Sequence, residues 1–396
     1  MKKKLLIWDI TYQLKDCGGP TGYLYNIHEY MKDYPTEEII FMSDLLNRET
    51  TNVLSDRKKI KDQLKKSFGG RFICDLVLLY NLYFQKLSYQ PPFDLNEYDF
   101  IHFHKLYDLQ RYQNALRYYK GKVVLTSHMP EPPFDETLNG FIYYKAFFRI
   151  FRNYFIRREV KIAEKLVSKW IFPTKYSIEP YTNLSRFYKD YFNANQDKLY
   201  FIPTGIIDKP SEKDDKFCPS LGIPKDKFKI LYLGRHNEVK GYDELKQIAN
   251  ELFKTSNDYV FVIGGKEEPL TRLEHENWIE LGWVNYASKL ISNCDLFILP
   301  NKETYFDLVA LEVLRAGTPI LLTLTGGNKF LVECTNTESA GILAYNRGNI
   351  DEAVSRIREI KKSLLPVMGK NNRELWAKYF TLGTFMENYL NFVREA

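Results

Sequence analysis

Residues 230–241 read ILYLGRHNEVKG, and this stretch decides the fold. Its apolar start indicates a buried strand that ends at Gly234, and a loop then presents Arg235 and Lys240 before a helix expected to begin near Tyr242. Two cations on a loop anchored to a strand suit a diphosphate group, because guanidinium and ammonium groups both pair with phosphate oxygens. Taken alone, the pattern is more typical of a solvated loop with two ordinary charges.

A second stretch, residues 296–312, reads LFILPNKETYFDLVALE. Its first four residues predict another buried strand, and a helix is expected from about 308 to 316, ended by Gly317-Thr318-Pro319. The unpaired N–H groups near residues 306–309 would form an anion site at the start of that helix. Glu312 lies one turn further, where a carboxylate can accept both hydroxyl groups of a ribose. The alternative is a capped helix with Glu312 on its solvated face.

The rest of the chain repeats this alternation of short apolar runs and longer helical stretches. Strands are expected at residues 5–10, 39–42, 100–103, 123–126, 170–173, 229–233, 259–263, 296–299 and 319–322. Such alternation predicts an α/β fold with parallel sheets covered on both faces. The pattern restarts after the polar stretch 208–216, so two doubly wound domains are expected, with the binding site in the cleft between them at the carboxyl ends of strands.

The composition excludes several classes of protein. With 44% hydrophobic and 27% charged residues among 396, the chain can bury a core, which excludes general disorder. The five cysteines form no CxxC pair, so neither a disulfide framework nor a zinc site is expected. This cysteine usage indicates a protein of the reducing cytoplasm. There is no apolar run of 18 residues, and Asp9 ends the apolar start after four residues, which is too short for a secretion signal.

Positive charge is concentrated in the first half of the chain. Residues 1–205 hold 31 basic and 23 acidic side chains, and the remainder holds 25 and 27. Residues 141–169 alone carry eight basic and two acidic side chains, interleaved with aromatics. A helix of this kind could lie on an anionic membrane surface through Arg149, Arg152, Arg157 and Arg158, or it could be a core helix with solvated cations. No nucleic-acid readout motif is present, so nucleic acid is not an expected partner.

Taken together, these motifs resemble those of the family 4 glycosyltransferases, which are retaining enzymes of GT-B architecture with two Rossmann-like domains. The resemblance covers about residues 201–396. The segments that carry it, in order, are 234–241, Gly282-Trp283-Val284 (expected as a strand), 300–312, Ala316-Gly317-Thr318-Pro319, Gly326-Gly327-Asn328 and Phe380-Thr381. The first half matches more weakly, through Gly18-Gly19, His102, His104 and Thr126-Ser127-His128.

The resemblance implies a division into domains and a role for each motif. It implies an acceptor-binding domain over residues 1–205, a nucleotide-sugar-binding domain over 206–380, and a helix over 381–396 that crosses back to the first domain. The implied catalytic residues are His128 and Glu303. The implied donor-binding residues are Gly18, Gly19, Arg235, Lys240, Gly282, Val284, Phe306, Leu308, Val309 and Glu312.

The spacing of the glutamates, Asp307 and four of the histidines need a separate interpretation. The family spaces its two glutamates by seven residues, whereas Glu303 and Glu312 are separated by eight, so Thr304 aligns with the first glutamate unless a bulge restores Glu303. The usual glycine of that turn is Asp307, which we expect to cap the helix. His102 and His104 are expected on one strand, as buried residues that face opposite sides. His236 and His275 are expected at the surface.

The resulting hypothesis is a retaining hexosyltransferase that uses a nucleotide-diphosphate sugar, with UDP-sugars favoured, and a saccharide or lipid-linked acceptor. It would act in surface polysaccharide or glycoconjugate synthesis, in the cytoplasm or at the inner face of the plasma membrane. No Asp-x-Asp pair is present, so we expect no metal or other cofactor. The alternative hypothesis is a non-catalytic partner or chaperone of another transferase, which the displaced Glu303 and the added Asp307 favour.

Overall fold

The computed structural model describes residues 2–15, 19–46, 68–141, 144–209, 213–335 and 341–396. The chain divides into two compact units. The first unit contains Met1–Phe172, Tyr181–Ile202 and Glu387–Ala396, and the second contains Pro173–Pro180 and Pro203–Met386. We expected two domains with a boundary between residues 205 and 206, and that boundary stays a prediction.

The first unit is built on a six-stranded parallel sheet with the strand order β2-β1-β3-β4-β5-β6. The strands are β1 (Leu5–Ile7), β2 (Ile39–Phe41), β3 (Phe100–Phe103), β4 (Lys122–Leu125), β5 (Lys169–Phe172) and β6 (Leu199–Phe201). The first five coincide with expected apolar runs. The edge strand β6 was not expected; its three residues are half-buried or exposed.

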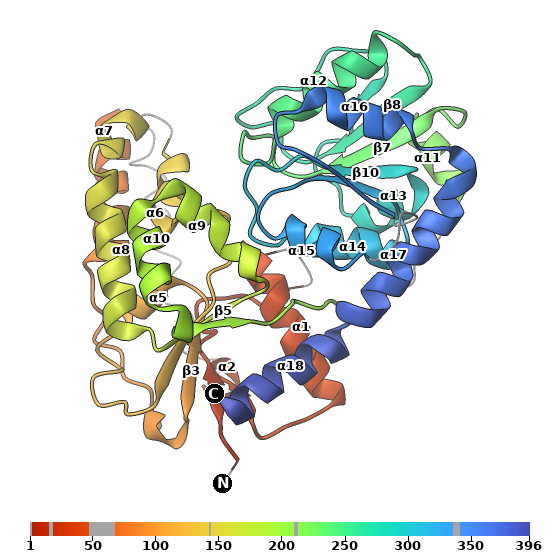
Figure 1. Ribbon diagram of the computed structural model, residues 1–396. Helices are drawn as coiled ribbons and strands as arrows, with labels where there is room; N and C mark the ends of the chain where they lie inside the picture. The colour runs from red at the N-terminus through yellow and green to blue at the C-terminus, as the bar shows by residue number, and fades with distance from the viewer. Residues whose placement is uncertain (1, 16–18, 47–67, 142–143, 210–212, 336–340) are drawn as a thin grey trace. The chain divides into compact units, whose positions relative to one another are not determined.

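Helices connect these strands and surround the first sheet (Figure 1). They are α1 (Gly19–Asp33), α2 (Met42–Leu45), α4 (Phe68–Tyr83), α5 (Leu106–Arg111), α6 (Pro133–Asn139), α7 (Lys145–Arg149), α8 (Arg152–Leu166), α9 (Glu179–Leu184), α10 (Arg186–Ala194) and α18 (Leu382–Glu395). The last turns of α18 belong to this unit, where the Tyr389 hydroxyl lies 2.5 Å from His102 Nδ1 and Arg394 pairs with Glu38.

The second unit has another six-stranded parallel sheet, in the order β12-β11-β10-β7-β8-β9. Its strands are β7 (Phe228–Leu233), β8 (Tyr259–Gly264), β9 (Trp278–Glu280), β10 (Leu296–Leu299), β11 (Ile320–Thr323) and β12 (Ile342–Tyr345). The chain runs outward from β7 through β8 to β9, and then returns to β10 on the other side of β7. The strand order therefore reverses between β7 and β10, which is the place where doubly wound sheets bind ligands.

The helices of the second unit begin and end where the local sequence directs. They are α11 (Phe217–Ser220), α12 (Tyr242–Phe253), α13 (Ala287–Asn293), α14 (Leu308–Ala316), α15 (Asn328–Glu333), α16 (Ile350–Arg358) and α17 (Leu365–Tyr379). The expected start at Tyr242 and the expected span 308–316 are both confirmed. Gly317, with φ +69°, ends α14 and hydrogen-bonds back to Leu314, a conformation that glycine adopts at little cost.

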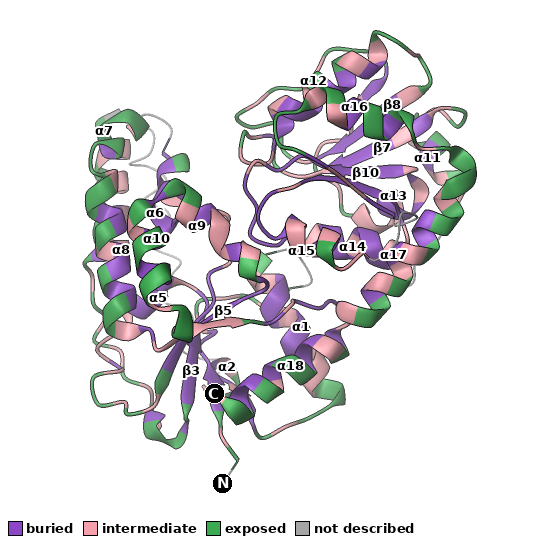
Figure 2. Cartoon of the chain, viewed as in Figure 1, coloured by how far each residue is buried: buried purple, intermediate pink, exposed green. Residues whose placement is uncertain are grey.

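The core of the second unit lies between its sheet and the helices α12 and α16. Leu245, Ile248, Ala249 and Leu252 form the apolar face of α12, and all four are fully buried against β7 and β8. Figure 2 shows the same pattern across the unit, with buried strands and helices that are exposed on their outer faces. Such a core holds the loops at the ends of the strands in fixed positions.

Candidate functional site

Two loops meet at the reversal point of the second sheet. The loop 234–241 leaves β7, and the loop 300–307 leaves the neighbouring parallel strand β10. Both loops are at the carboxyl edge of the sheet. The first carries Arg235 and Lys240, and the second carries Glu303 and leads into α14. The structure thus brings together the residues of the two stretches that the sequence singled out.

Close backbone contacts fix these two loops against each other. A Cβ on Gly241, where φ is +67°, would lie 1.7 Å from the Pro300 carbonyl oxygen, so only glycine fits. The Lys302 amide donates to the Val239 carbonyl at 2.9 Å. The Thr323 hydroxyl at the end of β11 donates to the carbonyl of Asn301 at 2.5 Å. These contacts leave the side chains of both loops on a rigid base.

Lys240 is paired with Asp307 in this structure. Its ammonium lies 2.7 Å from Oδ1 and 2.8 Å from Oδ2 of Asp307, and Asn301 donates a further hydrogen bond to the same carboxylate. Burial alone would raise the pKa of Asp307, but the charge of Lys240 and these hydrogen bonds outweigh it and lower the pKa. The carboxylate therefore stays ionised and neutralises the lysine.

The expectation that the Asp307 side chain caps α14 is wrong. Asp307 does occupy the N-cap position, with φ −77° and ψ 122°, but its side chain makes no capping hydrogen bond. The carboxylate turns to Lys240 instead, because a buried ion pair with three hydrogen bonds stabilises the charge better than a single backbone amide. The first N–H groups of α14 are consequently left without a side-chain cap.

The other expected donor-binding residues of this unit surround the same edge. Phe306 is buried, while Leu308, Val309 and Glu312 are half-buried on the first turns of α14. Arg235 is exposed, and its guanidinium makes no ion pair with any residue that the structure describes. It is the more accessible of the two loop cations.

Gly282 and Val284 lie just beyond β9, not in a strand as the sequence motif suggested. β9 ends at Glu280, and Gly282 adopts φ +65°. Its carbonyl accepts a hydrogen bond from the Gly265 amide at 2.8 Å, so this turn is tied to the end of β8. Val284 is packed close to Gly264, where an added Cβ would lie 3.3 Å from a Val284 methyl group. Both residues are thus at the same carboxyl edge as Arg235.

Glu303 is nearly buried and is held by Arg347. The guanidinium donates to Glu303 Oε1 at 3.0 Å and to the Lys302 carbonyl at 3.0 Å. Thr304, the residue that aligns with the first glutamate of the family, is fully buried. Arg347 follows β12, an edge strand that was not expected, so this ion pair had no signal in the sequence.

The expectation that His236 lies at the surface is wrong. His236 is fully buried and stacks on Tyr242, with ring centroids 4.0 Å apart and an angle of 9° between the rings. Its Nε2 lies 3.3 Å from Glu280 Oε1, and burial lowers the pKa of the imidazole. The packing of this ring on Tyr242 therefore holds the loop 234–241 against the start of α12. His275 is exposed, as expected.

Three histidines gather at the carboxyl edge of the first sheet. β3 ends at Phe103, just before His104. The expectation that His102 and His104 face opposite sides is wrong, because residues two apart in an extended chain point to the same face. Their ring centroids are 4.2 Å apart, and His104 Nδ1 lies 3.1 Å from His128 Nε2. His102 Nε2 contacts the Thr126 hydroxyl at 2.8 Å, and both imidazole nitrogens of His102 are thus occupied.

These imidazoles are neutral near pH 7. Burial, reinforced by the charges of neighbouring groups, lowers the pKa of His102 and of His128 to about 3. His128 can therefore donate or accept one hydrogen bond at each nitrogen but does not carry a permanent charge. Of the glycines expected nearby, Gly18 lies outside the described residues, and Gly19 is the first residue of α1, with φ +75°.

Only part of the expected basic surface is accessible. Instead of one helix, the segment forms α7 and α8, and Lys169 already belongs to β5. Arg152 forms a salt bridge to Asp135 at 2.5 Å and also donates to the Leu184 carbonyl, so its guanidinium is already engaged. Arg158 donates to the Tyr83 carbonyl at 2.9 Å. Arg149 and Arg157 are exposed, as a surface role requires.

Among the described residues, no three His, Cys, Asp or Glu side chains gather in a way that could hold a metal ion. None of the described helices is both long enough and apolar enough to span a bilayer.

Comparison with solved structures identifies the class of fold. HepE of Anabaena, solved in complex with UDP and glucose, superposes with a TM-score of 0.60 at 14% identity, covering 100% of both chains. Sucrose-phosphate synthase from Thermosynechococcus elongatus gives a TM-score of 0.63 at 15% identity, over 100% of this chain and 99% of that one. Two doubly wound units with this similarity define the GT-B fold, as the sequence predicted.

Comparison of sequences finds relatives of the second unit. Residues 213–375 match the model of the family described as glycosyl transferases group 1, so the second unit carries a domain of this family and the resemblance seen in the motifs is confirmed. An uncharacterized glycosyltransferase of Methanocaldococcus jannaschii is 30% identical over 42% of this chain and 46% of its own. A UDP-Gal:alpha-D-GlcNAc-diphosphoundecaprenol alpha-1,3-galactosyltransferase of Escherichia coli is 26% identical over 53% and 58%. The matched region thus spans roughly half the length of these relatives.

Proposed function

We propose that the protein is a retaining glycosyltransferase that moves a hexose from a nucleotide-diphosphate sugar, a UDP-sugar by preference, to a saccharide or lipid-linked acceptor. The observation that carries the proposal is the position of Arg235, Lys240 and the start of α14 at the reversal point of a doubly wound sheet. All of them lie within the residues that match the family. The UDP preference rests on HepE, solved with UDP, and on the E. coli relative named for UDP-Gal.

In this proposal each group has a defined task. Arg235 and Lys240 pair with the diphosphate, and the uncapped N–H groups of α14 stabilise the negative charge that develops as the diphosphate leaves. Glu312 accepts the ribose hydroxyls, and the backbone at Gly282 and Val284 flanks the base. His128 and Glu303 remain the proposed catalytic residues, and the departing phosphate assists deprotonation of the acceptor hydroxyl.

The alternative, a non-catalytic partner of another transferase, is favoured by one observation. Lys240 is neutralised by Asp307, so the cation that should hold the diphosphate is already paired. Against this, Arg235 is exposed and Glu312 lies half-buried on α14, and a scaffold protein has no use for groups that would bind a nucleotide diphosphate. We therefore prefer the enzyme, with Lys240 released from Asp307 or shared between Asp307 and the diphosphate when the donor binds.

We further propose that the protein binds its acceptor at an anionic membrane surface. Large apolar side chains are exposed on α7 and α8 and on the adjoining α4, among cations. They are Ile73, Leu76, Val77, Tyr80, Phe147, Ile150, Phe151 and Tyr154, of which Ile150 is 77% exposed. Exposed apolar residues mixed with Arg149 and Arg157 are typical of a surface that lies in a lipid interface.

Ligand-dependent stabilisation tests the donor site. UDP at 100 times its dissociation constant should raise the free energy of unfolding by about 2.7 kcal/mol, whereas GDP and dTDP should have smaller effects. A radiolabelled UDP-hexose assay with mixed lipid-linked acceptors then separates the two functions. Binding of UDP without any transfer would favour the non-catalytic alternative, and failure of all three diphosphates to stabilise the protein would refute the donor site itself.

A further inference from the structure

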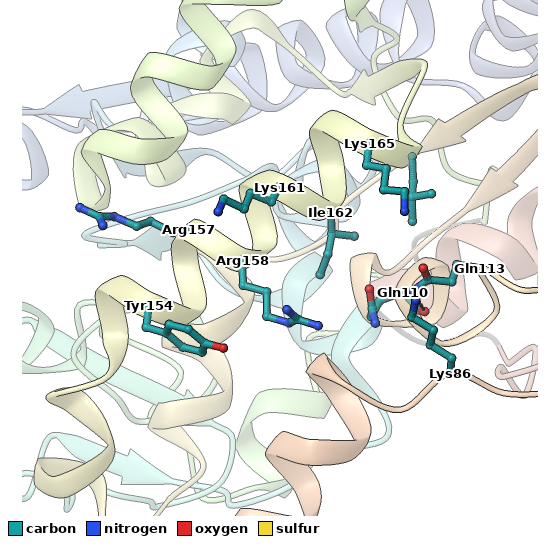
Figure 3. A pocket seen from close by; sticks show the side chains of 10 residues that line it. Lys86, Gln110, Gln113, Tyr154, Arg157, Arg158, Lys161, Ile162 and Lys165 are labelled. Carbon is teal, nitrogen blue, oxygen red and sulfur yellow. Dashed lines mark hydrogen bonds between the residues drawn. The ribbon is translucent and has the colours of Figure 1, made fainter.

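A hollow of about 500 Å³ in the first unit is lined by five cationic side chains and by no carboxylate. Four of the cations come from one face of α8, and the fifth follows α4: they are Arg157, Arg158, Lys161, Lys165 and Lys86. Figure 3 shows Arg158 extending from α8 toward Gln110, with Lys86 and Gln113 beyond. Like charges gathered in this way repel one another unless an anion lies between them.

Contacts within the protein do not neutralise these cations. Lys86, Lys161 and Lys165 form no ion pair with any residue that the structure describes. Arg158 donates to the Tyr83 carbonyl, and its guanidinium lies 4.3 Å from the centre of the Phe84 ring, so its contacts are to neutral groups. The nearby carboxylates Glu164 and Asp190 line a separate hollow on another side of α8, which Arg157 and Lys161 also border.

A buried hydrogen-bond donor lines the same hollow. The side chain of Gln110 is only 3% exposed, and its amide Nε2 has no hydrogen-bond partner among the residues that the structure describes. A buried donor without a partner is destabilising, so the Gln110 amide calls for an acceptor such as a water molecule or an anion. An anion in the hollow would accept a hydrogen bond from Gln110 and pair with the surrounding cations at once. This observation is independent of the charge count.

The rim of the hollow is apolar, and this favours an anion that carries an apolar group. Tyr154 belongs to the lining and is 54% exposed, and Phe84, beneath Arg158, is 36% exposed. The exposed residues of α4 continue this surface, from Ile73 to Tyr80. A soluble phosphate makes no favourable contact with such a rim, whereas a lipid presents a phosphate group to the cations and acyl chains to the apolar rim.

We propose that this hollow binds the phosphate group of an anionic membrane lipid, with Lys86, Arg158, Lys161, Lys165 and the Gln110 amide as its partners. The inference deepens the proposed attachment to a membrane, because it assigns a specific site to what would otherwise be general attraction. It does not depend on the donor site, which belongs to the second unit.

Vesicle binding with matched charge variants tests the proposal. The probe is phosphatidylcholine vesicles with and without phosphatidylglycerol, and the variant is Lys86→Gln/Lys161→Gln/Lys165→Gln. Since each cation at an anionic surface contributes about a factor of five, this triple variant should bind about 100-fold more weakly. The control, Arg117→Gln/Lys120→Gln/Lys189→Gln, makes the same change in net charge at exposed positions outside the hollow and should change binding less than about threefold.

An uncharged change provides a second test. Gln110→Leu keeps the net charge and should weaken binding of phosphatidylglycerol vesicles about tenfold, measured by calorimetry, because it removes the donor to the phosphate. Equal losses in the two triple variants would overturn the site in favour of general attraction. Binding of glycerol 3-phosphate without vesicles, as tight as that of the vesicles, would overturn the lipid assignment, as would binding of RNA that competes with vesicles. Stabilisation by UDP should be unchanged in every variant, which separates this test from that of the donor site.

Discussion

Replacing Asp307 by asparagine should make the protein less stable but a better binder of nucleotide diphosphate. In the structure the Lys240 ammonium lies 2.7 Å from the nearer carboxylate oxygen. A phosphate oxygen bound about 2.8 Å from the same ammonium would therefore lie at most about 5.5 Å from that carboxylate. Two unit charges at this distance repel by about 3 kcal/mol with an effective dielectric constant of about 20. Some of this repulsion is avoided by movement of the lysine, so we expect affinity for UDP to rise about tenfold.

The effect on stability should have the opposite sign. The Asp307→Asn variant would keep the shape of the side chain but lose its charge, and a hydrogen bond to a charged group contributes about 1.5–3 kcal/mol. The pKa of Asp307 is lowered in the folded protein, so its contribution is complete above the unfolded value of 3.8 and is lost as the pH falls through the folded value. The stability difference between wild type and variant should therefore be largest near neutral pH and shrink in acid.

Calorimetric titration with UDP and denaturant unfolding measure the two effects on the same preparations. Asp295→Asn is the matched control, because Asp295 also pairs with a lysine, Lys229, but at the amino end of β7, away from the loops. The control should lose stability and leave the affinity for UDP unchanged. If Asp307→Asn is folded and binds UDP no better than wild type, Asp307 does not compete with the diphosphate and the reasoning is refuted.

Three further results are expected. Arg235→Ala and Lys240→Ala should each lower the rate of hexose transfer about 10²–10³-fold while the proteins stay folded, as checked by circular dichroism; activity within a factor of two of wild type in both would remove the phosphate assignment. Transfer should persist in excess EDTA, and inhibition that added Mn²⁺ reverses would show that a metal is needed after all. Arg394→Gln should destabilise the protein at neutral pH, since hydrogen bonds from Arg394 lower the pKa of the buried Glu38, and this difference should vanish once the pH falls below the lowered pKa. A difference that persists at low pH would show that packing, not the ion pair, is lost.

The sequence predicted the fold well because buried strands and helix ends have strong local signals. Continuous apolar runs indicated nine of the strands, and Gly317 indicated the end of α14. The edge strands β6, β9 and β12 were not identified as such, because runs of three or four residues do not distinguish a strand from a helix by their periodicity. The break between α7 and α8 was also missed, since no proline or glycine marks it.

The candidate site was less predictable, because its decisive contacts join residues far apart in the chain. Motif spacing indicated Lys240 and Asp307 separately, but nothing in the sequence shows that they pair across 67 positions. The same holds for Glu303 with Arg347 and for the packing of His236 beneath its loop. The expectation for His102 and His104 misapplied the alternation rule, because residues two apart on a strand point to the same face, as the 4.2 Å between their ring centroids shows.

The packing of α18 on the first unit has a consequence for folding during synthesis. His102 and Tyr389 are separated by 287 positions, and the buried Glu38 has its arginine partner at position 394. A ribosome adding about 5–20 residues per second must therefore synthesise all of residues 203–386 before the earliest part of the chain can bury its last side chains. During that interval the apolar surface that α18 later covers, which includes Phe100, stays exposed. Truncation at residue 386 should trap this state permanently, with increased dye binding and aggregation, even though the second sheet is complete.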